Sequence, residues 1–187
     1  MPLIGSVAPA PAAAATTPSW TGTEAALPAG ASAGFLNSVS CPSAGDCAAV
    51  GNYTDSSGMQ GLLLTESSGT WTHTEAPLPA GAGTNPAVSL NSVSCPSASD
   101  CAAVGNYTDS SYHEQGLLLT ESSGTWTATE APLPAGAGAG FLNSVSCPSA
   151  GDCAAVGDYR DSSDNDRGLL LTESSGTWTG AEAPLPA

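Results

Sequence analysis

Apolar and polar residues alternate along short stretches of this chain, and each stretch ends in a cluster of turn residues. Residues 36–41, Leu-Asn-Ser-Val-Ser-Cys, read as a short strand that ends at a cluster of turn residues. Turn residues follow at 42–46, residues 47–53 read as the returning strand, and a polar loop leads to a third strand at 61–66. This pattern predicts an antiparallel sheet, and no stretch shows the periodicity of a helix.

A fourth strand is predicted where the chain reads Trp71-Thr-x-Thr-Glu, and the prolines that follow mark its end because they cannot donate hydrogen bonds to a ladder. The whole four-strand unit then returns twice, nearly letter for letter, with a period of about 52 residues. The repeat domain spans residues 20–187. We place the repeats at residues 34–80, 88–135 and 140–187.

Two segments precede the first repeat. Residues 20–28, which begin at Trp20, copy only the fourth strand and predict an orphan strand that can complete a neighbouring molecule. Residues 1–19 are rich in alanine and proline and contain A-x-A-like sites. We interpret residues 1–19 as a disordered linker or the remnant of an export signal.

The third strand of each repeat determines how the repeats should pack. Leu62, Leu63 and Leu64 are consecutive, so this strand is apolar on both faces and should be covered on both. We therefore predict an all-β fold of three four-stranded antiparallel repeats that stack as β-propeller-like blades. A β-trefoil is the alternative, because it also uses three four-stranded repeats of about this length.

Three blades are fewer than the 4–8 of ordinary propellers. We therefore expect either a homo-oligomer, in which blades or edge strands pair between chains, or a sequence that belongs to a longer protein. The orphan strand favours assembly, because it has no place in a closed object of three repeats.

Charge excludes several classes of partner. The chain of 187 residues has 17 acidic side chains, two arginines and no lysine, for a formal net charge of −15. Nucleic acids and anionic membrane surfaces both require clustered basic residues, so we predict no nucleic-acid partner. No apolar run approaches the length of a membrane span, so we predict no membrane insertion.

The six cysteines form three pairs with the same spacing, and each pair flanks the turn between the first two strands. An even count without a histidine pattern predicts three structural disulfides and an oxidising, extracellular location. A zinc site would need more cysteine or histidine ligands than one repeat offers. The predicted pairs are Cys41 with Cys47, Cys95 with Cys101, and Cys147 with Cys153.

These residues resemble a known type of repeat. Val39-Ser-Cys41-Pro-Ser43 followed by Cys47-Ala-Ala-Val-Gly51 is similar to the S-V-S-C-x-S-x-x-x-C-x-A-V-G repeats of secreted, actinobacterial-type tandem-repeat proteins. The resemblance covers about residues 16–187. It implies a propeller-like fold and export, and it implies no particular activity.

Comparison of the three copies separates structural from functional candidates. Asp46, Asp100 and Asp152 recur in the first turn, and Glu66, Glu121 and Glu173 recur before the last turn, so we interpret both sets as structural. Repeats with identical environments should not push the pKa values of these carboxyls apart, as acid–base catalysis requires.

The loop between the second and third strands differs among the copies, and rigid scaffolds usually carry binding residues on such loops. The three loops should emerge on one rim. The candidate ligand-binding residues are Met59, Gln60, Tyr112, His113, Glu114, Arg160, Asp161, Asp164, Asp166 and Arg167.

Metal and nucleophile chemistry receive less support. Asp161, Asp164 and Asp166 are a weak calcium candidate, because calcium takes 6–8 oxygen ligands, but the flanking arginines oppose a cation. We predict no other cofactor and no catalytic residue. His113 has no serine or cysteine partner in a nucleophile motif, and His73 should lie on an outward polar position.

The sequence thus predicts a secreted, non-catalytic module for binding or structural assembly, which oligomerises and has an unidentified glycan or protein ligand. A secreted hydrolase with acidic side chains on the variable loop face is one alternative. A self-assembling fibre subunit is another, favoured by the low charge density and the orphan strand.

Overall fold

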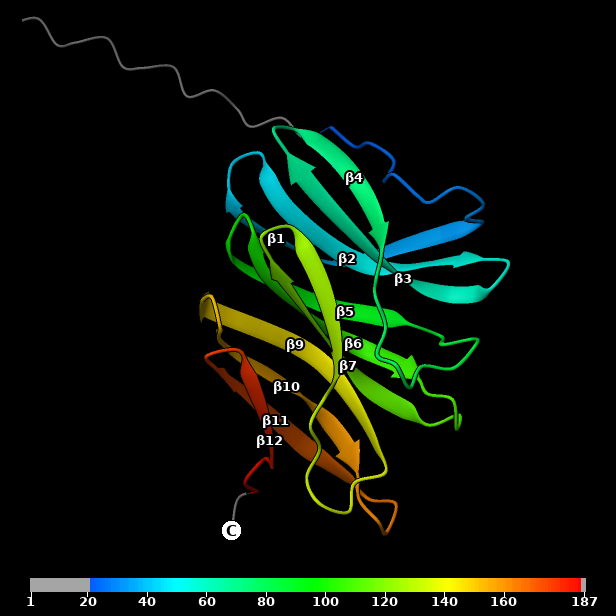
Figure 1. Ribbon diagram of the computed structural model, residues 1–187, viewed down its shortest axis with the longest axis vertical. Coiled ribbons are helices and arrows are strands. Elements are labelled where there is room, and N and C mark those ends of the chain that lie inside the picture. Colours follow the sequence, from blue (N-terminus) through cyan, green and yellow to red (C-terminus); the bar gives the residue numbers. More distant parts are fainter. Residues whose placement is uncertain (1–20, 186–187) are drawn as a thin grey trace, which may run out of the picture.

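The computed structural model describes residues 21–185, which form three antiparallel sheets and no helix (Figure 1). Each sheet is a four-stranded meander in chain order. Sheet 1 contains β1 (Ala33–Ser43), β2 (Asp46–Asp55), β3 (Gly58–Ser67) and β4 (Thr70–Glu75). Sheet 2 contains β5 (Ser89–Ser97), β6 (Asp100–Thr108), β7 (Glu114–Ser122) and β8 (Thr125–Glu130). Sheet 3 contains β9 (Ala139–Ser149), β10 (Asp152–Arg160), β11 (Asp166–Ser174) and β12 (Thr177–Glu182).

The predicted all-β fold of three four-stranded repeats is therefore confirmed, and the turns form for local reasons. Between β3 and β4, Ser68 and Gly69 both have positive φ angles, 51° and 81°. Two such residues make the tight hairpin turn whose twist matches that of the strands. The serine–glycine pair recurs in sheets 2 and 3 with the same signs. Between β1 and β2, the Ser43 hydroxyl donates to the Asp46 carboxylate at 2.7 Å, which is the local role predicted for this aspartate.

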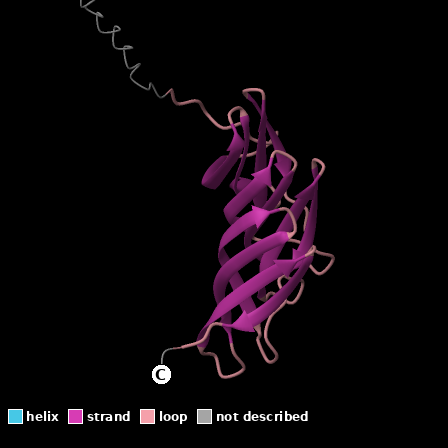
Figure 2. Ribbon diagram, turned by 90° about the vertical axis from the view of Figure 1, so that its left-hand side faces the viewer, coloured by secondary structure: helices cyan, strands magenta, loops and turns pink. Residues whose placement is uncertain are grey.

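The three predicted disulfides are also confirmed. They join Cys41 to Cys47, Cys95 to Cys101 and Cys147 to Cys153, each across a sequence separation of 6. Each bridge links the ends of the first two strands beside their connecting turn. The sheets stack along the long axis of the molecule, and Figure 2 shows their strands crossing that axis obliquely.

Packing between sheets follows one rule at both interfaces. The first strand of a sheet lies across the first three strands of the sheet before it: β5 packs on β1, β2 and β3, and β9 packs on β5, β6 and β7. Leu63 and Leu118 point to the following sheet, whereas their neighbours in the leucine triplets point to the preceding side. The triplet strands of sheets 1 and 2 are thus covered on both faces, as their sequence predicts.

Side-chain hydrogen bonds connect the sheets in the same repeating way. A β-bulge at Asn91 interrupts the pairing of β5 with β6, and the Asn91 amide donates to the backbone carbonyl of Leu142 in sheet 3 at 2.7 Å. Asn37 makes the equivalent bond to Leu90 at 2.8 Å. The Ser92 and Ser94 hydroxyls accept from the backbone amides of Val145 and Cys147, and Ser38 and Ser40 accept from Val93 and Cys95.

Replacing Asn91 with alanine should lower the free energy of unfolding by about 1–3 kcal/mol, because the carbonyl of Leu142 loses its partner at a packed interface. Asn143 occupies the same position in sheet 3 but is exposed and bonds only within its sheet, to Asp158. Asn143→Ala is therefore the matched control and should change stability by less than about 0.5 kcal/mol. Urea denaturation of both variants measures the difference, and equal losses would contradict the inter-sheet role.

The two ends of the stack expose residues that are buried inside it. In β1, Leu36 is 46% and Val39 61% exposed, whereas Leu90 and Leu142 are fully buried and Val93 and Val145 are 6% exposed. In sheet 3, Val156 is 44% and Leu170 39% exposed, whereas their equivalents in sheets 1 and 2 are at most 2% exposed. The cause is the same at both ends, since the described residues provide no adjoining sheet there.

Two predictions need correction. The predicted orphan strand does not form, because residues 21–28 have no neighbouring strand among the described residues with which to pair. Instead, Ala25 and Leu27 pack on β2 and β3. The three sheets are not joined by strand pairing into a closed barrel, which the β-trefoil alternative would require. Trp20, residues 1–19 and residues 186–187 lie outside the described residues.

Candidate functional site

The variable loops emerge on one rim of the stack. They connect β2 with β3, β6 with β7, and β10 with β11, and Figure 1 shows them along the side opposite the tight turns that connect the other strands. This placement follows from the meander, because alternate connections leave a sheet at opposite ends. The candidate residues therefore share a rim, but they differ greatly in accessibility.

An aspartate begins all three loops and shapes them. The carboxylates of Asp55, Asp109 and Asp161 each accept a backbone N–H two residues on, at 2.7–2.8 Å. This is the local bond by which aspartate stabilises a turn. Asp161 is thus a repeat-wide structural residue rather than a feature added to the third loop. The shared Asp-Ser-Ser of the three loops is the sequence signal for it.

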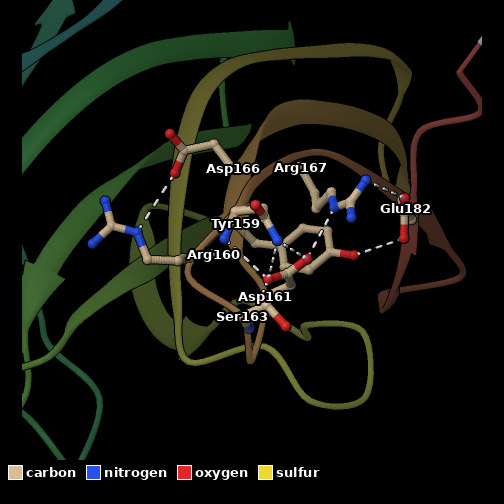
Figure 3. A network of polar contacts seen from close by, with 8 residues as sticks. Tyr159, Arg160, Asp161, Ser163, Asp166, Arg167 and Glu182 are labelled. Carbon is tan, nitrogen blue, oxygen red and sulfur yellow. Dashed lines mark hydrogen bonds and ion pairs between the residues drawn. The ribbon is translucent and has the colours of Figure 1, made fainter.

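The third loop uses most of its charges internally (Figure 3). Asp161 also accepts from the backbone N–H of Asn165 and from Arg167 Nε, both at 3.0 Å. These bonds, led by the Asn165 amide, lower the pKa of Asp161 to about 2. Arg167 Nη1 lies 4.0 Å from Glu182, and Arg160 Nε lies 3.5 Å from Asp166.

The weak calcium candidate of the third loop includes Asp161, which is already engaged within the loop. Both carboxylate oxygens of Asp161 already accept hydrogen bonds. No group of three acidic, histidine or cysteine side chains within residues 21–185 is arranged to hold a metal ion.

The second loop presents its side chains to solvent. Tyr112 is 90% exposed. Its φ of 65° lies in the left-handed region, which is energetically unfavourable for a bulky residue. Asp109 holds this conformation, because its backbone carbonyl accepts from the Tyr112 N–H at 3.1 Å and its carboxylate accepts from the His113 N–H at 2.9 Å. That second bond is the main cause of the lowered pKa of Asp109.

His113 and Glu114 extend the exposed surface next to Tyr112. The His113 side chain is 63% exposed, and its Nδ1 lies 3.6 Å from Asp109. Glu114 opens β7 and is also exposed. The three side chains form one exposed group, and in the third loop Arg160, Asp164 and Asp166 are exposed as well.

The first loop contributes least. Gln60 is only 6% exposed and lies inside the sheet, so the proposed binding face leaves it out. Met59 is half-buried, and Gly58, with a φ of 111°, packs so closely on Asn85 that a Cβ there would lie 2.2 Å from the asparagine oxygen. His73, away from this rim, is exposed on β4 as its strand position predicts.

One repeated polar contact escaped the sequence interpretation. A buried tyrosine near the end of the second strand donates its hydroxyl to a glutamate on the fourth: Tyr53 to Glu75 at 2.5 Å, Tyr107 to Glu130 at 2.8 Å and Tyr159 to Glu182 at 2.9 Å. Burial is the main cause of the raised tyrosine pKa values, followed by the hydrogen bond. The joint recurrence of tyrosine and glutamate in all three copies was the available signal.

Buried carboxyls lie near the opposite rim, beside the disulfides. Glu121 and Glu173 are 6% and 5% exposed and line a cavity of about 240 Å³ between sheets 2 and 3, whereas Glu66 in sheet 1 is only half-buried. Burial, with a smaller contribution from Asp100 or Asp152, raises the pKa of both buried carboxyls. The prediction that the three equivalent glutamates have identical environments was wrong, because a sheet at the end of the stack lacks a neighbouring sheet on one side.

Replacing Glu121 with glutamine should raise the free energy of unfolding at neutral pH. A raised pKa means that the folded chain holds the proton more tightly than the unfolded chain. The carboxyl thus contributes stability below the ordinary glutamate value of 4.5, and this contribution is lost as pH rises through the folded pKa. Glutamine avoids the loss because it carries no charge.

Denaturation of wild type and E121Q across this pH range tests the prediction, and the difference should vanish well below 4.5. The matched control is Glu66→Gln, at a half-buried position, which should show a smaller effect. A stabilisation that is independent of pH would contradict the assignment to charge burial.

Comparisons with known proteins do not assign the chain to a family. No protein-family model matches the chain, and a search of curated proteins returns no match. None of the described residues form a helix with the length and apolar character that crossing a membrane requires.

Proposed function

We propose that this protein is a secreted, non-catalytic repeat module that works by self-assembly and presents a variable loop rim for binding. The single observation that carries the proposal is the exposure at both ends of the stack of residues that are buried between its sheets. Leu36 and Val39 lie exposed at one end, and Val156 and Leu170 at the other. Exposed apolar patches of this kind mark interaction sites in soluble proteins.

The three disulfides support secretion, because such bonds persist in oxidising compartments. The resemblance to secreted, actinobacterial-type repeats points the same way. In this proposal the sheets are propeller-like blades, and copies of the chain supply the blades that three repeats lack.

The binding role of the rim rests on the second loop. Tyr112 offers an exposed aromatic side chain on a loop whose backbone is fixed by Asp109, and His113 and Glu114 offer polar groups beside it. Loops carried by a rigid sheet are common binding elements, and aromatic side chains supply contact area at small entropic cost.

The two alternatives, a secreted hydrolase and a fibre subunit, are supported to different degrees. A hydrolase needs two carboxylates of different character facing one cleft, and the buried pair Glu121 and Glu173 lies near the rim opposite the variable loops. A fibre subunit is compatible with the same end faces, since an interface between unlike faces propagates when its rotation does not close.

Sedimentation velocity over a range of protein concentrations, without reductant, tests the proposal. Molar mass should rise with concentration above that of the 18.2 kDa chain. Salt should favour association, because it screens the repulsion between copies that each carry a net charge of −15. A particle that stays monomeric at all concentrations would contradict self-assembly.

A further inference from the structure

We infer that two copies of this chain dock head to tail, with the outer face of sheet 3 in one copy against the outer face of sheet 1 in the other. The outer face of sheet 1 is defined by Leu36 and Val39, and that of sheet 3 by Ala154, Val156 and Leu170. This inference rests on the proposed function and adds the faces, their polarity and the register.

Residue identity at the two outer faces supports this docking. Inside the chain, Ala48, Val50 and Leu63 of sheet 1 form one apolar cluster with Leu90 and Val93 of sheet 2. The outer face of sheet 3 carries the same three residue types at the equivalent positions, Ala154, Val156 and Leu170. The outer face of sheet 1 likewise repeats Leu90 and Val93 as Leu36 and Val39. The docked copies would therefore rebuild an interface that the fold already makes twice.

The register follows from the hydrogen bonds between sheets. At the internal interfaces, an asparagine amide and two serine hydroxyls of one sheet bond the backbone of the first strand of the next. Asn143, Ser144 and Ser146 are the exposed equivalents on sheet 3. Their counterparts on β1 of a second copy are the Leu36 carbonyl and the amides of Val39 and Cys41. Outside the β1–β2 ladder, residues 21–185 supply no hydrogen-bond acceptor to those two amides.

Two further features affect the docking: the charge of the two outer faces, and the chain segment that lies over the outer face of sheet 1. The apolar and polar residues that define the two faces are uncharged, but one acidic side chain lies beside each face: Glu24 at sheet 1, and Asp158, which accepts from the Asn143 amide, at sheet 3. A groove of about 380 Å³ lies on the outer face of sheet 1, between β1 and residues 23–26, with Leu36, Val39 and Glu24 in its lining. Residues 21–26 form no strand, although Ala25 packs on β2 and β3, and docking of the second sheet requires this segment to move aside.

Complementation between two variants provides the decisive test. Val39→Asp damages only the outer face of sheet 1, and Val156→Asp damages only that of sheet 3. Each variant alone should self-associate at least about tenfold more weakly than wild type, because docking would bury an unpaired carboxylate. An equimolar mixture should form dimers, because one intact face of each variant remains and the two are of opposite kind.

Controls separate the docking mode from assembly in general. Tyr112→Asp, at an aromatic site on the loop rim that is more exposed than either valine, should leave association unchanged. Asn143→Ala should weaken association without changing the stability of the monomer. Circular dichroism and thermal denaturation of every variant check that the fold is retained.

Each outcome decides one question. A mixture that stays monomeric, or a Val39→Asp variant that associates as wild type does, overturns the head-to-tail interface while self-association of the wild type upholds the proposed function. A wild type that never associates overturns both. Closed pairs and open arrays both support the inference, because both use this interface.

Discussion

Reduction of the three disulfides should lower the free energy of unfolding by roughly 6 kcal/mol, about 2 kcal/mol for each bridge, by the chain-entropy estimate for short loops. Each bridge closes a loop with a sequence separation of only 6, so the three should contribute about equally through the unfolded chain. The combined loss is comparable to the whole stability of many domains, which is about 5–15 kcal/mol. The protein should therefore unfold at much lower urea concentration in the presence of a strong reductant.

A matched pair of variants separates chain entropy from packing. Replacing both Cys95 and Cys101 with serine removes a bridge that is buried between sheets 1 and 2. Replacing Cys41 and Cys47 removes the equivalent bridge of sheet 1, where Cys41 is exposed. We expect the first change to cost more than the second, because serine hydroxyls would be buried at the interface. Free thiols in the native protein, or equal stability with and without reductant, would contradict the structural role.

Leu118→Ala should lower the free energy of unfolding by about 2–5 kcal/mol, the usual cost of a large-to-small change at a buried site. Leu118 is 2% exposed and belongs to the apolar cluster between sheets 2 and 3. The loss includes both the transfer of apolar surface and the cavity left behind, since sheets on both sides restrict relaxation. Urea or thermal denaturation measures it.

The repeat supplies the control for this variant. Leu170 is the same residue at the same position of sheet 3, but it is 39% exposed because no sheet covers it in the described chain. Leu170→Ala should cost less than about 1 kcal/mol when the protein is monomeric. Similar losses for the two variants under monomeric conditions would mean that stacking of sheet 3 on sheet 2 does not explain the burial of Leu118. At concentrations that promote docking, the cost at Leu170 should increase.

Much of the fold was predictable because each repeat carries local signals. The alternation of apolar and polar residues, the serine–glycine turns and the paired cysteines depend on near neighbours in the chain, and the structure confirms the sheets and bridges that they predict. The leucine triplet likewise predicted coverage on both faces, which holds in sheets 1 and 2 but not in sheet 3, where Leu170 is 39% exposed. Strand ends were less accurate: β3 begins at Gly58, three residues before the predicted start, because its ladder with β2 continues to Asp55.

The candidate site was less predictable, because accessibility depends on packing between segments far apart in the chain. Gln60 and Tyr112 looked alike as variable loop residues, yet one is buried and the other exposed. Asp161 looked like a calcium ligand, although its equivalents Asp55 and Asp109 show that it shapes the loop. The recurrence of that aspartate was visible, but which hydrogen bonds it makes was not.

Sequence alone therefore determined the repeat unit, its strands and its disulfides, because these depend on short-range pattern and spacing. Only the tertiary structure determined that equivalent residues of the three repeats differ in burial. Leu90 is buried and Leu36 exposed, and Glu121 is buried while Glu66 is only half-buried. The physical reason is that burial is a property of the stack rather than of the repeat. A sheet at either end of the stack has one face against which no other sheet of the described chain packs.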